Sequence, residues 1–257
     1  MDTLQIHPTM ECNRRCKFCS YKDADNAQSL PFDFIHDQVS KAVKLGCKTL
    51  KISGGGEPLL YDSIISLLCL AKYYHLYVQL QTNGDDLSFL YWKFCDDVRV
   101  SLSDERHLES RPAHYAHGFS YVVTAKPDYD NLGSVVGHAI ANDKYVKITQ
   151  DDTDLGNVPD IEEIKSRLFE SPNLTFWDAK DYHIGQNPCP ECMRSPLLGA
   201  DGYYYPCCRS QYAKGNNLIN YDASMRLGQD IESIILVPNV GTNTGYDGSE
   251  CTRCYYQ

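Results

Sequence analysis

The sequence predicts an α/β protein: a partial (β/α)6 TIM-like barrel followed by a small C-terminal extension. Short β-like runs alternate with helical stretches over the first two-thirds of the chain, the alternation comprises six repeats, and it stops after about Pro172. Such alternation is typical of parallel strands joined by helical crossovers, and six repeats fit an open barrel better than a closed one of eight. We therefore expect a barrel domain over 1–172 and an extension over 173–257.

Each element is expected from its own pattern of residues. Runs rich in β-branched and aromatic residues predict six strands, at 4–8, 49–53, 76–81, 98–102, 119–125 and 145–149. Amphipathic stretches predict helices at 32–45, 61–74, 86–94, 131–141 and 160–170. Beyond these, the run 197–208 predicts a hairpin, because Asp201-Gly202 supplies the positive φ angles of a tight turn.

The composition excludes several classes of protein. The 257 residues are 42% hydrophobic and 23% charged, which suits a full core and excludes a disordered or fibrous chain. A formal charge of −10 opposes tight binding to a nucleic-acid backbone. The chain shows neither a signal peptide nor a run of the roughly 20 apolar residues that a membrane helix needs. We expect a cytoplasmic protein without nucleic-acid or membrane partners.

Twelve cysteines are many for such a protein, and a reducing compartment favours metal-binding thiolates over disulfides. Cys47, Cys69 and Cys95 stand singly among apolar neighbours, so we expect them to pack in the core. The remaining cysteines gather near the two ends of the chain. Their positions predict one metal site at each end.

Cys12, Cys16 and Cys19 lie in a loop directly after the first predicted strand. Three thiolates at these spacings can hold three irons of a [4Fe–4S] cluster, which leaves the fourth iron open for an outside ligand. Zinc is the alternative, with His7 as a possible fourth ligand, although structural zinc sites favour four local ligands.

The pattern C-x3-C-x-aromatic-C, with Phe18 as the aromatic residue, resembles the signature of the radical S-adenosylmethionine (SAM) superfamily. The resemblance implies that SAM chelates the open iron. Reduction of the cluster then cleaves SAM to a 5′-deoxyadenosyl radical, which abstracts hydrogen from a substrate. It also implies an electron donor such as flavodoxin or ferredoxin.

The resemblance extends to residues at later strand ends. Ser53-Gly54-Gly55-Gly56-Glu57-Pro58 follows the second predicted strand, and in the family a Gly-Gly-Glu-Pro segment there binds the amino group of SAM. On this basis the expected cofactor-binding residues are Gly55, Gly56, Glu57, Asn83, Ser101, Ser103 and Arg111. A plain Gly-rich loop, an Asn-Gly turn and ordinary surface roles remain the alternatives for these residues.

The second group of cysteines leaves two interpretations. From the residues alone, two C-x2-C pairs, Cys189 with Cys192 and Cys251 with Cys254, are typical of a closed zinc site. However, C-x9-G-x4-C followed by a distant C-x2-C resembles the SPASM/twitch extension of radical SAM enzymes. That resemblance implies one auxiliary [4Fe–4S] cluster on Cys192, Cys207, Cys251 and Cys254, with Cys189 and Cys208 outside the pattern.

We therefore expect a radical SAM oxidoreductase or isomerase with a small-molecule substrate. Dehydrogenation or epimerisation of a sugar or aminocyclitol is the leading hypothesis, with Cys208 as a candidate hydrogen donor in an epimerisation. Modification of a peptide or protein is the first alternative. It is less favoured, because an N-terminal recognition domain would have to precede Cys12. A non-catalytic zinc-binding module is the second.

Overall fold

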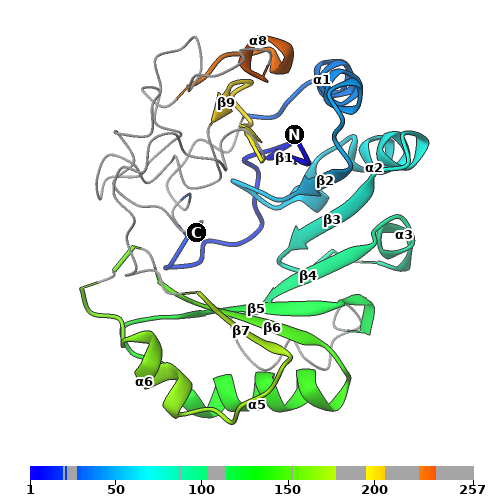
Figure 1. Cartoon of the computed structure of the whole chain (residues 1–257). Helices are drawn as coiled ribbons and strands as arrows, with labels where there is room; N and C mark the ends of the chain where they lie inside the picture. The colour runs from blue at the N-terminus through cyan, green and yellow to red at the C-terminus, as the bar shows by residue number, and fades with distance from the viewer. Residues whose placement is uncertain are drawn as a thin grey trace.

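The computed structural model describes residues 1–19, 21, 28–86, 88–102, 114–151, 153–154, 156–177, 195–205 and 226–235. In these residues one curved sheet carries its helices along its outer side, as Figure 1 shows for α1, α2, α3, α5 and α6. The strand order is β7-β6-β5-β4-β3-β2-β1-β8-β9. Strands β1 to β7 are parallel and follow one another in chain order, so the expected α/β class with a barrel-like sheet is confirmed.

The elements begin and end close to the expected positions. The parallel strands are β1 (Thr3–Ile6), β2 (Thr49–Ile52), β3 (Tyr77–Thr82), β4 (Asp97–Leu102), β5 (Gly118–Val123), β6 (Tyr145–Gln150) and β7 (Leu174–Trp177). The helices are α1 (Phe32–Lys44), a 3₁₀ turn η1 (Pro58–Leu60), α2 (Ile64–Tyr73), α3 (Phe89–Trp92), α5 (Tyr129–Ala141), α6 (Ile161–Ser166) and α8 (Ile231–Ile235).

Alternation along the strands sorts apolar and polar side chains onto the two faces of the sheet. In β4, Val98, Val100 and Leu102 are buried, whereas Arg99 is half-buried and Ser101 exposed. The apolar set packs against the helices in one continuous core, because successive side chains of a strand point to opposite faces. The other face of β4 is polar, with Asp97, Arg99 and Ser101.

The expectation about the end of the barrel is corrected. The alternation does not stop at about residue 172, because β7 follows α6 and pairs in parallel with β6. This strand has only four residues, and none of them is buried, so the periodicity that marks a half-buried strand is missing from its sequence. Helices α2, α3 and α6 are also shorter than expected.

The predicted hairpin is present as β8 (Leu197–Leu198) and β9 (Tyr204–Tyr205), and its turn places Gly202 at φ 81°. Strand β8 pairs in parallel with β1, so the hairpin extends the barrel sheet. Tyr204 and Tyr205 are both fully buried. The Tyr204 hydroxyl donates to Gln38 Oε1 on α1 (3.1 Å), and that of Tyr205 donates to Asp201 (2.8 Å).

The three cysteines that were expected to pack in the core do not all do so. Cys47 and Cys95 are buried, as expected, but Cys69 is exposed. On α2 the buried residues are Ile64, Leu67, Leu68, Leu70 and Ala71. The helical period therefore leaves Cys69 on the outer side. Within the described part of the chain, no helix has the length and apolar character needed to span a membrane.

Candidate active site

The candidate residues meet at one edge of the sheet. The cysteine loop follows β1, the Gly-rich segment follows β2, and Asn83 follows β3. Because the strands are parallel, their C-terminal ends share one edge, where barrel enzymes place their functional loops. Ser101 lies near the same end of β4 and is exposed, with its hydroxyl 3.0 Å from that of Ser120 on β5.

The cysteine loop carries three half-buried thiols. The amide of Cys19 donates to the carbonyl of Cys16 (3.0 Å), which forms a turn between the last two. Two sulfurs accept amide hydrogens: Cys12 Sγ from Arg14 and Cys19 Sγ from Tyr21, both at 3.4 Å. Burial raises the pKa of the Cys12 thiol, opposed by that hydrogen bond from Arg14.

The thiols are not arranged around a single ion. In the described ranges, no three His, Cys, Asp or Glu side chains lie together as one metal ion would require. A cubane distributes its ligands, one cysteine to each of three irons, so it does not need that geometry. The zinc alternative requires that geometry. His7, its possible fourth ligand, follows β1, is 3% exposed and packs edge-on against Tyr21.

The Gly-rich segment lies directly against the cysteine loop. The Gly56 amide donates to the Thr9 carbonyl (3.1 Å), and the Glu57 amide donates to the Glu11 carbonyl (2.7 Å). A Cβ on Gly56 would stand 2.1 Å from the Glu11 carbonyl oxygen, so the close approach requires glycine. A Cβ on Gly54 would stand 1.6 Å from the Gly56 carbonyl oxygen, and Gly55 is buried.

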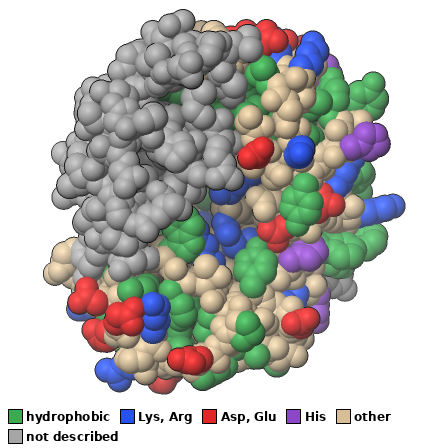
Figure 2. Space-filling model, viewed as in Figure 1, with side chains coloured by type: hydrophobic (Ala, Val, Ile, Leu, Met, Phe, Trp, Pro, Cys, Tyr) green, Lys and Arg blue, Asp and Glu red, His purple; other side chains and the backbone are tan. Residues whose placement is uncertain are grey.

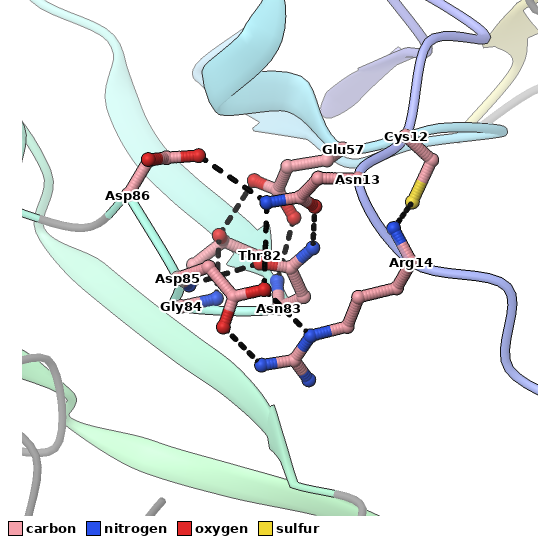
Figure 3. Close-up of polar contacts among 9 residues, drawn as sticks. All are labelled: Cys12, Asn13, Arg14, Glu57, Thr82, Asn83, Gly84, Asp85 and Asp86. Atoms are coloured by element: carbon pink, nitrogen blue, oxygen red, sulfur yellow. Dashed lines mark hydrogen bonds and ion pairs between the residues drawn. The ribbon is translucent and has the colours of Figure 1, made fainter.

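Glu57 joins this segment to the end of β3 (Figure 3). Its carboxylate is 2% exposed and accepts from the Thr82 hydroxyl (2.6 Å), the Leu59 amide (3.1 Å) and the Asn83 amide (2.7 Å). Burial raises the pKa of Glu57, and these three donors oppose that shift. The carboxylate therefore fixes the relative positions of two strand ends.

A second set of contacts joins the cysteine loop to the segment after β3 (Figure 3). The Asn83 side-chain amide donates to Asn13 Oδ1 (2.6 Å). Arg14 donates through Nε to Asp85 (2.8 Å) and makes a second contact through Nη2, forming a bidentate ion pair. Sequence reasoning missed Asn13, Thr82 and Asp85. Asn13 and Asp85 adjoin recognised motifs, but nothing in their spacing indicates that they meet.

Several expected site residues lie outside the described residues. They are Ser103, Arg111, Cys189, Cys192, Cys207, Cys208, Cys251 and Cys254. The structure does describe the three expected cluster cysteines and five of the expected SAM-binding residues. They are Cys12, Cys16, Cys19, Gly55, Gly56, Glu57, Asn83 and Ser101. The first seven are brought together by the loops after β1, β2 and β3, and Ser101 lies one strand further along the sheet.

A family model matches the part of the chain that carries this site. Residues 6–102 match the model described as Radical SAM superfamily, and they include the cysteine loop, the Gly-rich segment and Asn83. This stretch is similar to the radical SAM superfamily. The family supports SAM and a [4Fe–4S] cluster as the cofactors of the site, and half-buried thiols with amide donors to sulfur fit such a cluster.

Curated proteins resemble the same N-terminal part of the chain. The chain is 30% identical over 105 residues to the Helicobacter pylori protein named GTP 3′,8-cyclase, and 33% identical over 108 residues to a probable GTP 3′,8-cyclase from Sulfurisphaera tokodaii. The matches cover 38% and 40% of this chain. They span about a third of the length of those relatives, 31% and 34%.

Solved structures share the fold over a longer stretch. Streptococcus suis SuiB bound to precursor peptide SuiA superposes with a TM-score of 0.67 at 13% identity, covering 98% of this chain and 70% of that one. The structure of anSMEcpe with bound AdoMet and Cp18Cys peptide gives 0.58 at 17% identity, covering 89% and 78%. At these identities the likeness establishes the fold.

Proposed function

We propose that the protein is a radical SAM enzyme that reductively cleaves SAM and abstracts a hydrogen atom from a substrate C–H bond. One observation carries the proposal: the cysteine loop and the Gly-Gly-Glu segment are joined by backbone hydrogen bonds at adjacent strand ends, inside the segment that matches the family. When bound, the reduced cluster and SAM supply the 5′-deoxyadenosyl radical for this chemistry.

Each part of the site has a role in this proposal. Cys12, Cys16 and Cys19 hold three irons through their sulfurs, and the amides of Arg14 and Tyr21 stabilise the thiolates. The contacts from Glu57 to β3 hold the Gly-rich segment in place, so that its backbone can receive the methionine end of SAM. Asn83, Ser101, Ser103 and Arg111 are the further proposed SAM contacts.

For the reaction, we favour dehydrogenation or epimerisation of a small molecule of sugar or aminocyclitol type. The polar inner face of the described sheet supports a polar substrate. Cys192, Cys207, Cys251 and Cys254 are the proposed ligands of an auxiliary [4Fe–4S] cluster in a domain over 173–257, and Cys208 is the proposed hydrogen donor. An electron donor such as flavodoxin or ferredoxin completes the system. Peptide modification is the alternative within the same chemistry.

The test is formation of 5′-deoxyadenosine by anaerobically reconstituted protein supplied with SAM and dithionite. We expect the wild-type protein to form it and the triple variant Cys12→Ala/Cys16→Ala/Cys19→Ala to lose it. Cys69→Ala is the matched control and retains activity, because this thiol lies exposed on α2. A colourless, zinc-containing wild-type protein, or 5′-deoxyadenosine formation by the triple variant, would refute the proposal.

A further inference from the structure

One of the three cations in the cysteine loop differs from the other two. Arg14, Arg15 and Lys17 all stand between the cysteines of the loop. Arg15 and Lys17 are exposed, so water and salt screen their charges, whereas the Arg14 side chain is only 15% exposed. Figure 2 shows Lys and Arg atoms (blue) in the hollow beside the grey atoms, so positive charge reaches recessed parts of this face. Within the loop, Arg14 carries the charge that is least screened.

Arg14 is paired with Asp85, in the segment after β3 (Figure 3). Its Nε donates to one carboxylate oxygen (2.8 Å) and its Nη2 donates to the other, which makes the ion pair bidentate. A bidentate pair fixes the direction of the guanidinium as well as its charge. The pair therefore holds the cysteine loop against the end of β3.

The turn after β3 positions the Asp85 carboxylate independently of Arg14. Gly84 adopts φ 86°, which favours glycine, and its amide donates to the Thr82 hydroxyl (3.0 Å). The Asp85 amide donates to Asn83 Oδ1 (2.9 Å). None of these hydrogen bonds uses an Asp85 side-chain atom, so we expect a substitution of the carboxylate to leave the turn intact.

The charge of Arg14 acts on the sulfurs that would hold the cluster. Arg14 is two residues from both Cys12 and Cys16, and its amide donates to Cys12 Sγ (3.4 Å). Hydrogen bonds to Asp85 raise the pKa of Arg14, burial opposes them, and the negative charge of Cys16 adds to the rise. Burial raises the pKa of Cys12, and the charge of Arg14 is among the effects that lower it. The guanidinium is therefore close enough to influence an electron placed on a cluster bound to these sulfurs.

The sign of that influence follows from electrostatics. One-electron reduction adds a negative charge to a [4Fe–4S] cluster, so a nearby cation stabilises the reduced form and raises the reduction potential, whereas a carboxylate lowers it. Electron transfer to SAM is favoured by a more negative potential, because the free energy of transfer is proportional to the difference in potential. An Arg14–Asp85 pair without net charge therefore suits this reaction better than a cation alone.

We propose that Asp85 is a positioning residue that, through its ion pair with Arg14, keeps the reduction potential of the cluster on Cys12, Cys16 and Cys19 low. This role rests on the proposed radical SAM function. Arg14 directs its amide toward Cys12 Sγ and fastens the loop to the end of β3. Asp85 offsets the effect that the charge of Arg14 would have on the cluster. The electron comes from the external donor and passes to SAM, so neither side chain is oxidised or reduced.

The test is a potentiometric titration of the reconstituted full-length protein, followed by electron paramagnetic resonance. The signal that changes when SAM is added identifies the cluster of the cysteine loop, since SAM binds only an open iron. We expect Asp85→Asn to shift the midpoint to a less negative potential. At the potential that reduces half of the wild-type cluster, most of the variant's cluster should then be reduced. Asp86→Asn is the matched control, because it removes the same charge from an exposed neighbour whose carboxylate contacts Asn13 (3.4 Å), and it should keep a midpoint near that of wild type.

Two further variants separate charge compensation from a purely structural role. Arg14→Gln should shift the midpoint in the opposite direction, and Arg14→Gln/Asp85→Asn should return it close to the wild-type value, because the pair then again has no net charge. A purely structural role would move both single variants the same way and the double variant at least as far. If Asp85→Asn alone fails to retain iron, the double variant should retain it with a midpoint near that of wild type, and iron loss from both would overturn the proposal.

The outcomes distinguish this inference from the proposed function. A wild-type midpoint in Asp85→Asn would overturn the role of Asp85, even if the protein forms 5′-deoxyadenosine. The expected opposite shifts, in a wild-type protein that forms no 5′-deoxyadenosine, would keep the role of Asp85 and refute the radical SAM function. Zinc in place of iron in the wild-type protein would overturn both.

Discussion

Two glycines show how differently a single Cβ is tolerated in this fold. A Cβ on Gly56 would collide with the Glu11 carbonyl at 2.1 Å, whereas one on Gly133 in α5 meets nothing within 4 Å. We expect Gly56→Ala to lower the free energy of unfolding by about 3 kcal/mol or more, because backbone must move. Gly133→Ala should raise it by about 0.5–1 kcal/mol, because alanine is the better helix former. Chemical denaturation of both variants checks this prediction, and a Gly56→Ala protein as stable as wild type would contradict it.

His7 makes stability depend on pH. Burial, together with the charge of Lys51, lowers the pKa of His7 to about 3, whereas a histidine in the unfolded chain titrates near 6.5. The unfolded state therefore binds a proton that the folded state does not. The stability due to neutral His7 is present above about pH 6.5 and is lost as the pH falls toward 3.

This linkage predicts a specific difference between variants. Between pH 7 and pH 5, His7 costs the wild-type protein about 2 kcal/mol of unfolding free energy, and His7→Gln should remove that part of the pH dependence. Denaturant titrations at the two pH values, at equal metal content, measure it. His36→Gln on α1 is the control, since its side chain is exposed, and it should retain the wild-type pH dependence. An unchanged pH dependence in His7→Gln would show that folding does not lower the pKa of His7.

At the scale of elements, the hairpin and α8 are fixed to α1 by one buried amide. Gln38 Oε1 accepts from the Tyr204 hydroxyl (3.1 Å) and from the Ile231 amide (2.9 Å), and Gln38 is 2% exposed. Gln38→Leu leaves two buried donors without an acceptor, so we expect a loss of about 2–4 kcal/mol. Tyr204→Phe removes only one hydrogen bond and should cost about 1 kcal/mol. Equilibrium unfolding that ranks the two variants in the reverse order would contradict this arrangement.

The loops after β1 and β3 illustrate what spacing cannot reveal. The cysteine spacing and the Gly-Gly-Glu segment were predictable, because each is a contiguous motif. The bidentate contact from Arg14 to Asp85 and the hydrogen bond from Asn83 to Asn13 were not, since they join residues about 70 positions apart. Only the parallel register of β1, β2 and β3 brings them to one edge of the sheet.

For the whole molecule, the number of clusters is the main quantitative prediction. With two [4Fe–4S] clusters, the reconstituted protein should hold about eight irons per chain. The Cys12→Ala/Cys16→Ala/Cys19→Ala variant should hold about four, because only the proposed auxiliary cluster would remain. Iron and zinc analysis of both proteins measures this. Alanine at Cys207 in the triple variant should reduce the remaining iron, whereas alanine at Cys189 should not. Zinc in place of iron in the triple variant would contradict the auxiliary cluster.

The sequence by itself determined the α/β class, the order of the strands and the cysteine and Gly-Gly-Glu motifs, because these depend on local periodicity and contiguous residues. It did not reveal β7, whose four residues are too short and too exposed for a periodic signal. Nor did it reveal the contacts of Glu57, since Thr82 and Asn83 lie 25 and 26 positions further along the chain. The register of the sheet decides those contacts, because the parallel pairing of β2 and β3 brings the ends of both strands to one edge.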